Sequence, residues 1–540
     1  MIAALQSAAP RHLAQGEPAR RWWEERSFYL FLILLAAVPL LYPPISPLID
    51  LPAHMGRYAV QLGIETSPTL QQWFGFEWKL IGNLGVDLLV EALAPVLGLE
   101  PAVKLIVILI PMITVAGFLW TAKEIHGRLP ATTAFAVPLA YSYPFHFGFV
   151  NYCLAMGIAF IGYALALRLT RQGRTWLRAA ALFVMGFIAW TAHAYGWALL
   201  GLLWFVTVVV RRWQAGPAKA VGSAILSSLP LAAPLVPMLL WRSGNSLGLD
   251  GWFALGGKLT WMVTLLRDRW MVADLLSAGV LYGAIAAAFV WRSRFRLDPI
   301  LLVAGLALLV VAMLLPSTIF SSAFADVRLI PYAAALLVLA ITLRAKGGER
   351  SERMVALLAA GFVIVRTVLT TVSLALYSNS YTAELQALNR VPAGSRIAAF
   401  SEHPCNSTWY DHRLRHLANL AIGRRQAYVN GQFVSEGWNA LRVTYQEAAP
   451  YTGFPSSIAT AKPGCEWPAP TAQEHVDALP QTAFDYVWVL NVPEERRPQA
   501  PWLARIWETD NSALYRVRPS TAEKTAPRQP LRLIPAGGRP

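Results

Sequence analysis

The sequence predicts a polytopic α-helical membrane protein with about eleven spanning helices and a small α/β domain near its C-terminal end. Of its 540 residues, 56% are apolar and only 14% are charged, whereas soluble domains have about 45–50% apolar and about 25% charged residues. Long apolar runs alternate with short basic connections from residue 28 to residue 377, and residues 378–540 have the composition of an ordinary soluble domain. Most of the chain is therefore too apolar for a soluble globule.

The net charge of +15 does not indicate a nucleic-acid-binding protein. Binding to nucleic acid needs basic groups gathered on one face of a folded domain. Here many of the Lys and Arg residues lie in short loops between apolar runs. The charge therefore reports membrane topology, and we expect no nucleic acid among the partners.

Eleven apolar segments are candidates for membrane spans, since a spanning helix needs about 20 apolar residues. The third and fifth are the weakest because they are short. The first follows a basic stretch and no small-residue cleavage site ends it, so we expect a retained helix rather than a signal peptide. The segments are 28–47, 101–121, 131–145, 148–168, 177–192, 195–210, 221–241, 276–291, 299–315, 329–343 and 354–377.

The distribution of Lys and Arg orients these spans, because cytoplasmic loops are enriched in both residues. With residues 1–27 as a basic cytoplasmic N-terminus, every short loop on the same side is basic. Loops 146–147 and 193–194 on the other side have no Lys or Arg, and loop 316–328 has only Arg328. An odd number of spans then places the C-terminal domain outside the cytoplasm. The expected cytoplasmic loops are 122–130, 169–176, 211–220, 292–298 and 344–353.

The first outer loop, residues 48–100, contains two stretches with helical periodicity. In the first, 50–63, apolar residues recur on one face of the expected helix. An amphipathic helix lying along the membrane surface fits this pattern, and Pro52 suits its first turn. The polar face of this helix carries Asp50, His54, Arg57 and Gln61.

Asp50 and His54 are the candidate catalytic residues. A carboxylate just outside the membrane can accept the proton of an attacking hydroxyl or amine, and Arg57 beside it can hold a phosphate by paired hydrogen bonds. The alternative is that Asp50 caps the helix while His54 and Arg57 face lipid headgroups. Pro52 has no N–H, so a cap by Asp50 would lose one of its two usual donors. This loss favours the catalytic interpretation.

The second stretch, 83–98, places Asn83, Asp87 and Glu91 on one helix face. Asp87 is a candidate for contact with substrate. Two acids on one face can hold a divalent cation, although such acids more often form a solvated face. We therefore assign no metal ligands and no definite cofactor, and a divalent cation is the one candidate.

Three further polar residues fall at the outer boundary of the expected bundle. His146 and Asn151 interrupt the aromatic run YSYPFHFGFVNY, residues 141–152, and His193 ends the fifth span at the same depth. The aromatic residues alone are typical of an interfacial belt. Together with His54, these histidines lack any close spacing typical of a zinc site. We expect them to be hydrogen-bonding groups that line a cavity.

Basic residues on the outer side are not explained by the positive-inside rule. Arg242 and Lys258 lie among tryptophans in the outer loop 242–275, and Arg328 stands with Asp326 where the tenth span begins. Such groups are costly to bury unless they are paired or functional, and interfacial anchoring is the alternative. The candidates for binding substrate or phosphate are thus Arg57, Asp87, His146, Asn151, His193, Arg242, Lys258 and Arg328.

Residues 378–518 are expected to form a small α/β domain. The pattern predicts strands at 395–400, 484–490 and 513–518, with helices at 411–422 and 434–448. Its histidines, His403, His412 and His416, are expected at the surface or in local hydrogen bonds. Residues 519–540, rich in Pro, Arg and Gly, are expected to be disordered.

Cys405 and Cys465 both belong to this domain. A disulfide between them is chemically allowed outside the cytoplasm. The sequence alone cannot place their backbones at bridging distance, so both states stay open.

On these features the chain resembles the GT-C class of membrane glycosyltransferases, which includes oligosaccharyltransferases, protein mannosyltransferases and aminoarabinose transferases. The likeness, over residues 20–377, lies in the first outer loop with an acid close behind span one, two loop helices, many spans and an outer C-terminal domain. In that class an acid of this loop acts as base or positions the acceptor, and Asp50, in IDLPAHMGR, matches that position. The class often has a pair of acids there, whereas this chain has a single Asp followed by Leu-Pro, so the match is partial.

The resemblance implies an inverting glycosyltransferase in the plasma (inner) membrane. It would move a sugar from a polyprenyl-phosphate-linked donor to a glycan, lipid or protein acceptor, in contact with membrane lipids. Such an enzyme needs a base and cations that stabilise the leaving phosphate.

Two alternatives stay open. A transporter or flippase would favour charges at mid-membrane and internal repeats, whereas these spans are nearly free of charges and no internal repeat is visible. A non-catalytic partner in polysaccharide assembly would tolerate loss of Asp50.

Overall fold

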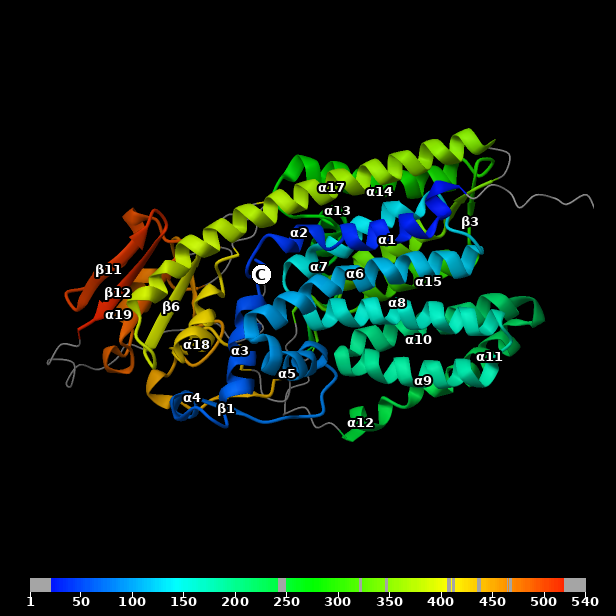
Figure 1. Ribbon diagram of the computed structural model, residues 1–540. Helices are drawn as coiled ribbons and strands as arrows, with labels where there is room; N and C mark the ends of the chain where they lie inside the picture. The colour runs from blue at the N-terminus through cyan, green and yellow to red at the C-terminus, as the bar shows by residue number, and fades with distance from the viewer. Residues whose placement is uncertain are drawn as a thin grey trace, which may run out of the picture.

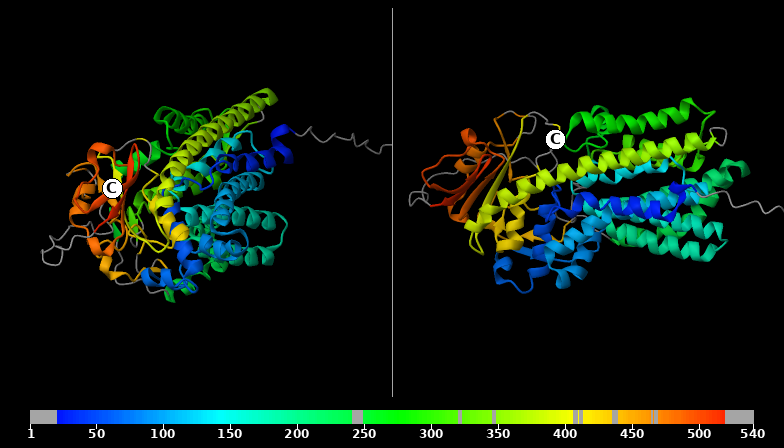
Figure 2. Two further views of the ribbon diagram at one scale, coloured as in Figure 1. Left: turned by 60° about the vertical axis from the view of Figure 1, so that its left-hand side comes forward. Right: turned by 45° about the horizontal axis from the view of Figure 1, so that its top comes forward.

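The computed structural model describes residues 21–518, apart from 241–248, 320–322, 345–347, 406–408, 410–412, 435–438, 464 and 466–468. Arg242, His412 and the segments 1–20 and 519–540 therefore lie outside the described residues. Long helices form a bundle on one side of the molecule, and a domain with a β-sheet lies on the other (Figure 1). The helix α17 (Gly348–Glu384) runs along the bundle and ends beside that domain, as both views of Figure 2 also show.

Within the described residues, six helices are long and apolar enough to cross a membrane, so the chain is a polytopic α-helical membrane protein. They are α6 (Leu99–His126), α8 (Val150–Arg171), α9 (Thr175–Ala192), α10 (Ala194–Arg212), α14 (Met271–Val290) and α17. Shorter apolar helices lie at the positions of three other predicted spans. They are α1 (Arg26–Leu35) with α2 (Val38–Leu41), α15 (Pro299–Leu314) and α16 (Ile330–Leu339). The count of eleven spans stays a prediction.

Two predicted spans are interrupted in the structure. The third consists of the 3-10 helix η2 (Thr133–Tyr141) and the short α7 (Tyr143–His146). The seventh is divided into α11 (Pro217–Ser228), η4 (Leu229–Ala232) and α12 (Leu235–Leu240). Prolines occur inside or between these pieces, and a proline lacks the N–H and clashes with the preceding turn. The length of an apolar run therefore does not show whether prolines interrupt its helix.

Short antiparallel strands join loop segments of the helix bundle in two pairs. The strand β3 (Phe295–Leu297), in a loop expected inside, pairs with β5 (Ile341–Leu343), which adjoins another such loop. The strands β2 (Leu249–Asp250) and β4 (Thr318–Ile319), both in loops expected outside, pair with each other. The β-sheet domain lies at the end opposite to β3 (Figure 1). Each strand pair thus joins two segments that the charge pattern predicts on the same side of the membrane.

The C-terminal domain contains a six-stranded sheet with the order β11-β12-β10-β6-β7, and β9 pairs with β6 off this path. The predicted strands are found as β6 (Arg396–His403), β10 (Tyr486–Leu490) and β12 (Ser512–Val517). The strands β7 (Tyr428–Val429), β9 (Ile458–Thr460) and β10 run parallel to β6, whereas β11 (Leu503–Thr509), β12 and β10 are joined antiparallel. Helices α18 (Leu420–Arg425) and α19 (Ala472–Asp477) complete the domain.

A helix and a boundary predicted for this domain differ from the structure. The helix predicted at 434–448 is wrong, because its described part forms β8 (Leu441–Val443) and the 3-10 helix η9 (Gln446–Ala448). The boundary predicted at residue 378 falls inside α17, which continues to Glu384. Cys405 and Cys465 form a disulfide, which settles the question that the sequence leaves open.

The first outer loop forms both predicted helices, α3 (Leu51–Gly63) and α5 (Gly85–Leu97), with the short α4 (Pro68–Trp73) between them. Its strand β1 (Phe74–Phe76) pairs with β8 of the C-terminal domain. The helix α3 is not a surface helix lying in the membrane boundary, since most of its residues, polar ones included, are buried. The C-terminal domain covers it through α18. The outer loop and the C-terminal domain therefore fold as one unit.

Candidate active site

Asp50 directly precedes α3, and its carboxylate does not cap that helix. Pro52 in the first turn has no N–H to offer it. The Asp50 side chain is 18% exposed, and its Oδ1 lies 3.7 Å from Nε2 of His416. The capping alternative is therefore excluded, and the carboxylate stays partly accessible.

The backbone at Asp50 is held by the aromatic segment 146–148. The N–H of Ile49 donates to the carbonyl of His146 at 3.2 Å, and the N–H of Asp50 donates to the carbonyl of Phe147 at 2.9 Å. Gly148 has φ +89°, and a Cβ there would lie 3.0 Å from the backbone nitrogens of Asp50 and Leu51. Glycine tolerates both this conformation and this close approach. The aromatic run that the sequence places at the outer boundary thus supports the candidate base.

Gly148→Ala is expected to displace Asp50. The added methyl group meets backbone atoms rather than a flexible side chain, so we expect a loss of about 1–3 kcal/mol in stability. We also expect a change in the rate at which a water-soluble carbodiimide modifies Asp50, measured by mass spectrometry. Gly127→Ala is the matched control, because Gly127 has φ +75° and nothing within 4 Å of its added Cβ. Equal effects of the two substitutions would contradict a role of Gly148 in placing Asp50.

The electrostatic surroundings of Asp50 favour a proton acceptor near neutral pH. Burial raises the pKa of Asp50 from 3.8 to about 6, and the guanidinium groups of Arg415 and Arg328 oppose this rise only in part. A general base works best when its pKa lies near the operating pH. The Asp50 carboxyl meets this condition.

Arg328 places a buried cation near Asp50. Its side chain is 7% exposed, its Cζ lies 3.7 Å from the ring centroid of Phe149, and Nη2 donates to the carbonyl of Ala323 at 2.6 Å. In the part of the chain that the structure describes, no carboxylate forms an ion pair with Arg328, and its Nε is buried without a hydrogen-bond partner. A buried charge without a counter-ion is costly. Arg328 is therefore the strongest candidate for binding an anionic group.

Aromatic residues fix the turn that carries Arg328. The hydroxyl of Tyr152 donates to the carbonyl of Arg328 at 2.8 Å, and the hydroxyl of Tyr195 donates to that of Ala325 at 2.9 Å. The ring of His193 lies 5.5 Å from that of Tyr152, measured between centroids. The structure thus brings His193 to the same side as Arg328, as the sequence predicts.

The segment 413–416 of the C-terminal domain also reaches this site, which the sequence analysis missed. His416 is 1% exposed and its ring packs on Phe433 and Phe454. Burial, with Arg415 beside it, lowers the pKa of His416 to about 3. Burial likewise lowers the pKa of His54 well below its usual value. Two neutral imidazoles therefore accompany Asp50. His416 does not lie at the surface, but it forms a local hydrogen bond with the backbone of Gly431, as the other part of the expectation states.

Arg57, Asp87 and Asn151 form a separate buried network. The guanidinium of Arg57 and the carboxylate of Asp87 are 2.8 Å apart, and both side chains are buried. Nδ2 of Asn151 donates to Oδ2 of Asp87 at 3.1 Å, and its Oδ1 accepts from the N–H of Val86 at 2.6 Å. These contacts join α3, α5 and α8. Asp87 thus binds both Arg57 and Asn151, so the guanidinium of Arg57 already has a carboxylate partner and is not a free site for a phosphate.

Lys258, like Arg57, already has partners within the protein. Its Nζ donates to the carbonyls of Ala312, Met313 and Leu315 at 2.9, 2.8 and 2.6 Å, and it lies 3.2 Å from Oδ2 of Asp326. Lys258 thus caps the C-terminal end of α15, where backbone carbonyls lack helical partners. Among the described residues, no group of three or more His, Cys, Asp or Glu side chains is placed to hold a metal ion. A divalent cation stays a prediction.

No protein-family model matches the chain, and no curated protein matches it in sequence. Among solved structures, it is similar to ArnT from Cupriavidus metallidurans bound to undecaprenyl phosphate, with a TM-score of 0.47 and 12% sequence identity. The likeness covers 91% of this chain and 97% of that one. A likeness at this level transfers neither site residues nor substrates.

Proposed function

We propose that this chain is a membrane glycosyltransferase that moves a sugar from a polyprenyl-phosphate-linked donor to an acceptor at the outer face of the plasma membrane. The observation that supports it is that Asp50 and Arg328 lie near each other without forming an ion pair. Asp50 offers a partly accessible carboxylate whose pKa is about 6. Arg328 offers a buried guanidinium with no counter-ion among the described residues. A base and an anion-binding cation together are what transfer from a lipid phosphate requires.

In the proposed reaction, a hydroxyl or amine of the acceptor attacks the anomeric carbon of the sugar. Asp50 takes the proton of that group, and the electron pair of the breaking bond passes to the phosphate oxygen. Arg328 and Arg415 stabilise the negative charge that develops on the leaving phosphate, which is the larger expected contribution. Attack opposite to the leaving phosphate inverts the anomeric configuration. The polyprenyl phosphate stays in the membrane.

Two features support the outer location of this site. The basic loops 122–130, 169–176 and 211–220 favour the cytoplasm. The Cys405–Cys465 disulfide suits an oxidising compartment. Because β1 pairs with β8, the outer loop and the C-terminal domain belong on one side.

The test is sugar transfer by the purified full chain in proteoliposomes. A panel of polyprenyl monophosphates carrying radiolabelled sugars serves as donor, and the same sugars on nucleotides serve as control donors. With glycans, lipids and proteins of the cell envelope as acceptors, we expect label to leave the polyprenyl fraction only with a lipid-linked donor. A transporter would instead move the intact donor across the bilayer. Label that changes leaflet without cleavage of the sugar–phosphate bond would refute the proposal.

A further inference from the structure

Each residue from 47 to 50 has a backbone group bound by a distant part of the chain. The carbonyl of Pro47 accepts a hydrogen bond from Nη1 of Arg413 at 2.7 Å, and the carbonyl of Leu48 accepts one from the hydroxyl of Tyr381 at 3.3 Å. The amides of Ile49 and Asp50 donate to residues 146 and 147. The backbone of residues 47–50 is therefore held from two sides, and the C-terminal domain forms one of these sides.

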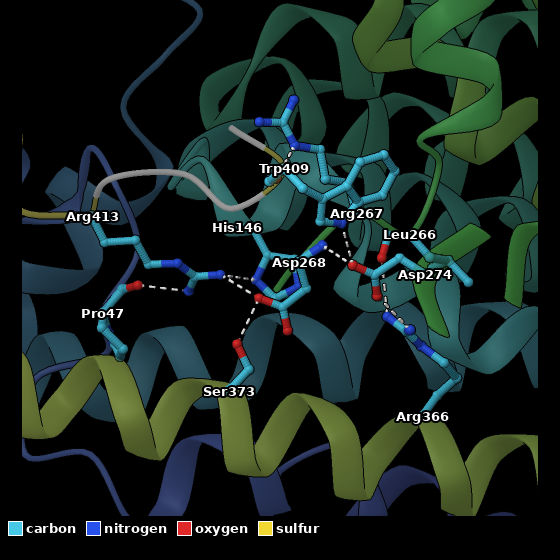
Figure 3. Close-up of polar contacts among 10 residues, drawn as sticks. All are labelled: Pro47, His146, Leu266, Arg267, Asp268, Asp274, Arg366, Ser373, Trp409 and Arg413. Carbon is cyan, nitrogen blue, oxygen red and sulfur yellow. Dashed lines mark hydrogen bonds and ion pairs between the residues drawn. The ribbon is translucent and has the colours of Figure 1, made fainter. Parts of the chain in front are cut away.

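Arg413 is the centre of this arrangement. Its side chain is 3% exposed, and its Cζ lies 4.1 Å from the ring centroid of Tyr377. Whereas Nη1 binds Pro47, Nη2 donates to Oδ1 of Asp268 at 2.7 Å and to Nδ1 of His146 at 3.2 Å (Figure 3). One guanidinium thus connects three parts of the chain: Pro47 in the segment before Asp50, His146 in the aromatic segment that binds the Asp50 backbone, and Asp268 in the loop that precedes α14.

The counter-ion of Arg413 is itself anchored in the helix bundle. The carboxylate of Asp268 accepts from the hydroxyl of Ser373 on α17 at 2.8 Å. The N–H of Asp268 donates to Oδ2 of Asp274 at 2.9 Å, and Asp274 forms a 2.8 Å ion pair with Arg366, also on α17 (Figure 3). Buried ion pairs keep one geometry when further hydrogen bonds satisfy them. Asp268 is therefore a firm support for Arg413.

We propose that Arg413 is a positioning residue for Asp50, so that the C-terminal domain completes the candidate active site. This inference rests on the proposed role of Asp50 as base and deepens it. Arg413 acts through the backbone of Pro47 and the ring of His146. Its planar guanidinium can bind a carboxylate, a carbonyl and an imidazole in fixed directions at once, which a lysine ammonium on a flexible stem does not reproduce.

A second ion pair between the domain and the bundle provides a matched control. Arg424 on α18 binds Glu100 at the start of α6, with 2.7 Å between Nε and Oε1. Both side chains are about one-third exposed, at 35% and 36%. Arg424→Ala therefore removes a contact between the same two parts of the molecule without touching residues 47–50.

The test is hydrogen–deuterium exchange of the full chain in nanodiscs, read on peptides covering residues 46–52. In Arg413→Lys we expect the amides of Ile49 and Asp50 to exchange about tenfold faster, because their supporting hydrogen bonds weaken. Arg424→Ala should leave their exchange unchanged. Tyr381→Phe, which removes the hydroxyl bound to Leu48 and to the carbonyl of Arg413, should give a smaller increase and serves if Arg413→Lys does not fold. Unchanged exchange in Arg413→Lys, or in Tyr381→Phe if that variant serves, would overturn the inference.

Transfer assays then separate the two proposals. Arg413→Lys should lower kcat about tenfold and leave the KM for the lipid-linked donor nearly unchanged, whereas Arg424→Ala should retain both. Equal kcat in Arg413→Lys and the wild-type chain would also overturn the positioning role. If exchange at Ile49 and Asp50 responds to Arg413→Lys but no form of the chain transfers sugar, the proposed function fails and the structural role of Arg413 stands.

Discussion

On the proposed function, Asp50→Asn is expected to lower the rate of sugar transfer by about 10²–10⁴-fold, the usual contribution of a general base. The amide has nearly the shape of the carboxylate but cannot take the proton of the attacking group. The fold should be unaffected, because the Asp50 side chain caps no helix turn and burial disfavours its charged form. The measurement is kcat in proteoliposomes, with thermal unfolding in detergent as the check on folding.

The same assignment predicts the pH dependence of the wild-type chain. The base must be deprotonated, and its pKa is raised from 3.8 to about 6. Transfer should therefore increase with pH up to about 6 and level off above it. Glu100→Gln is the control, since Glu100 is an outer acid that binds Arg424. An Asp50→Asn chain that folds normally and transfers at the wild-type rate would remove Asp50 from the reaction.

Arg328→Gln is expected to raise the KM for the lipid-linked donor about 10–10²-fold, the magnitude of a lost hydrogen bond to a charged group. The donor phosphate would lose the one buried guanidinium that lacks an ion-pair partner among the residues described at this site. Arg328→Lys should rescue this loss poorly, because an ammonium does not give paired hydrogen bonds to phosphate. Binding of polyprenyl phosphate without sugar, measured by native mass spectrometry, reports the same loss without turnover.

Stability distinguishes this role of Arg328 from a structural one. Arg366→Gln breaks the buried pair with Asp274 and should lower the free energy of unfolding by about 3–5 kcal/mol. Arg328→Gln leaves no carboxylate behind and should change stability by less than about 1 kcal/mol. If Arg328→Gln instead unfolds as readily as Arg366→Gln and binds polyprenyl phosphate normally, Arg328 supports the fold and not the ligand.

The polytopic membrane fold and the position of Asp50 before a helix could be predicted because both depend on short stretches of sequence. Apolar runs and basic loops are local signals, and the helix after Asp50 shows its period within 50–63. The absence of a cap could be anticipated from Pro52 alone. The broken third and seventh spans could not be recognised from apolar length, because their prolines interrupt helices without lowering hydropathy.

The pairing of charges could not be predicted, since it depends on segments that meet only in the folded chain. The sequence places Arg57, Lys258 and Arg328 together at the outer side as equal candidates. In the structure Arg57 binds Asp87, and Lys258 binds Asp326 and three carbonyls, whereas Arg328 has no such carboxylate among the described residues. His416 and Arg413 lie in a domain that no periodicity or spacing connects with Asp50.

The contact between Arg413 and Pro47 also has a consequence for how the protein is made. The two residues are 366 positions apart. At a synthesis rate of about 5–20 residues per second, Arg413 is added about 20–70 s after Pro47. On the proposed topology, Asp50 would reach the outer face of the membrane before its support from the C-terminal domain is made. On the proposed function, a nascent or truncated chain would therefore transfer sugar more slowly than the complete chain.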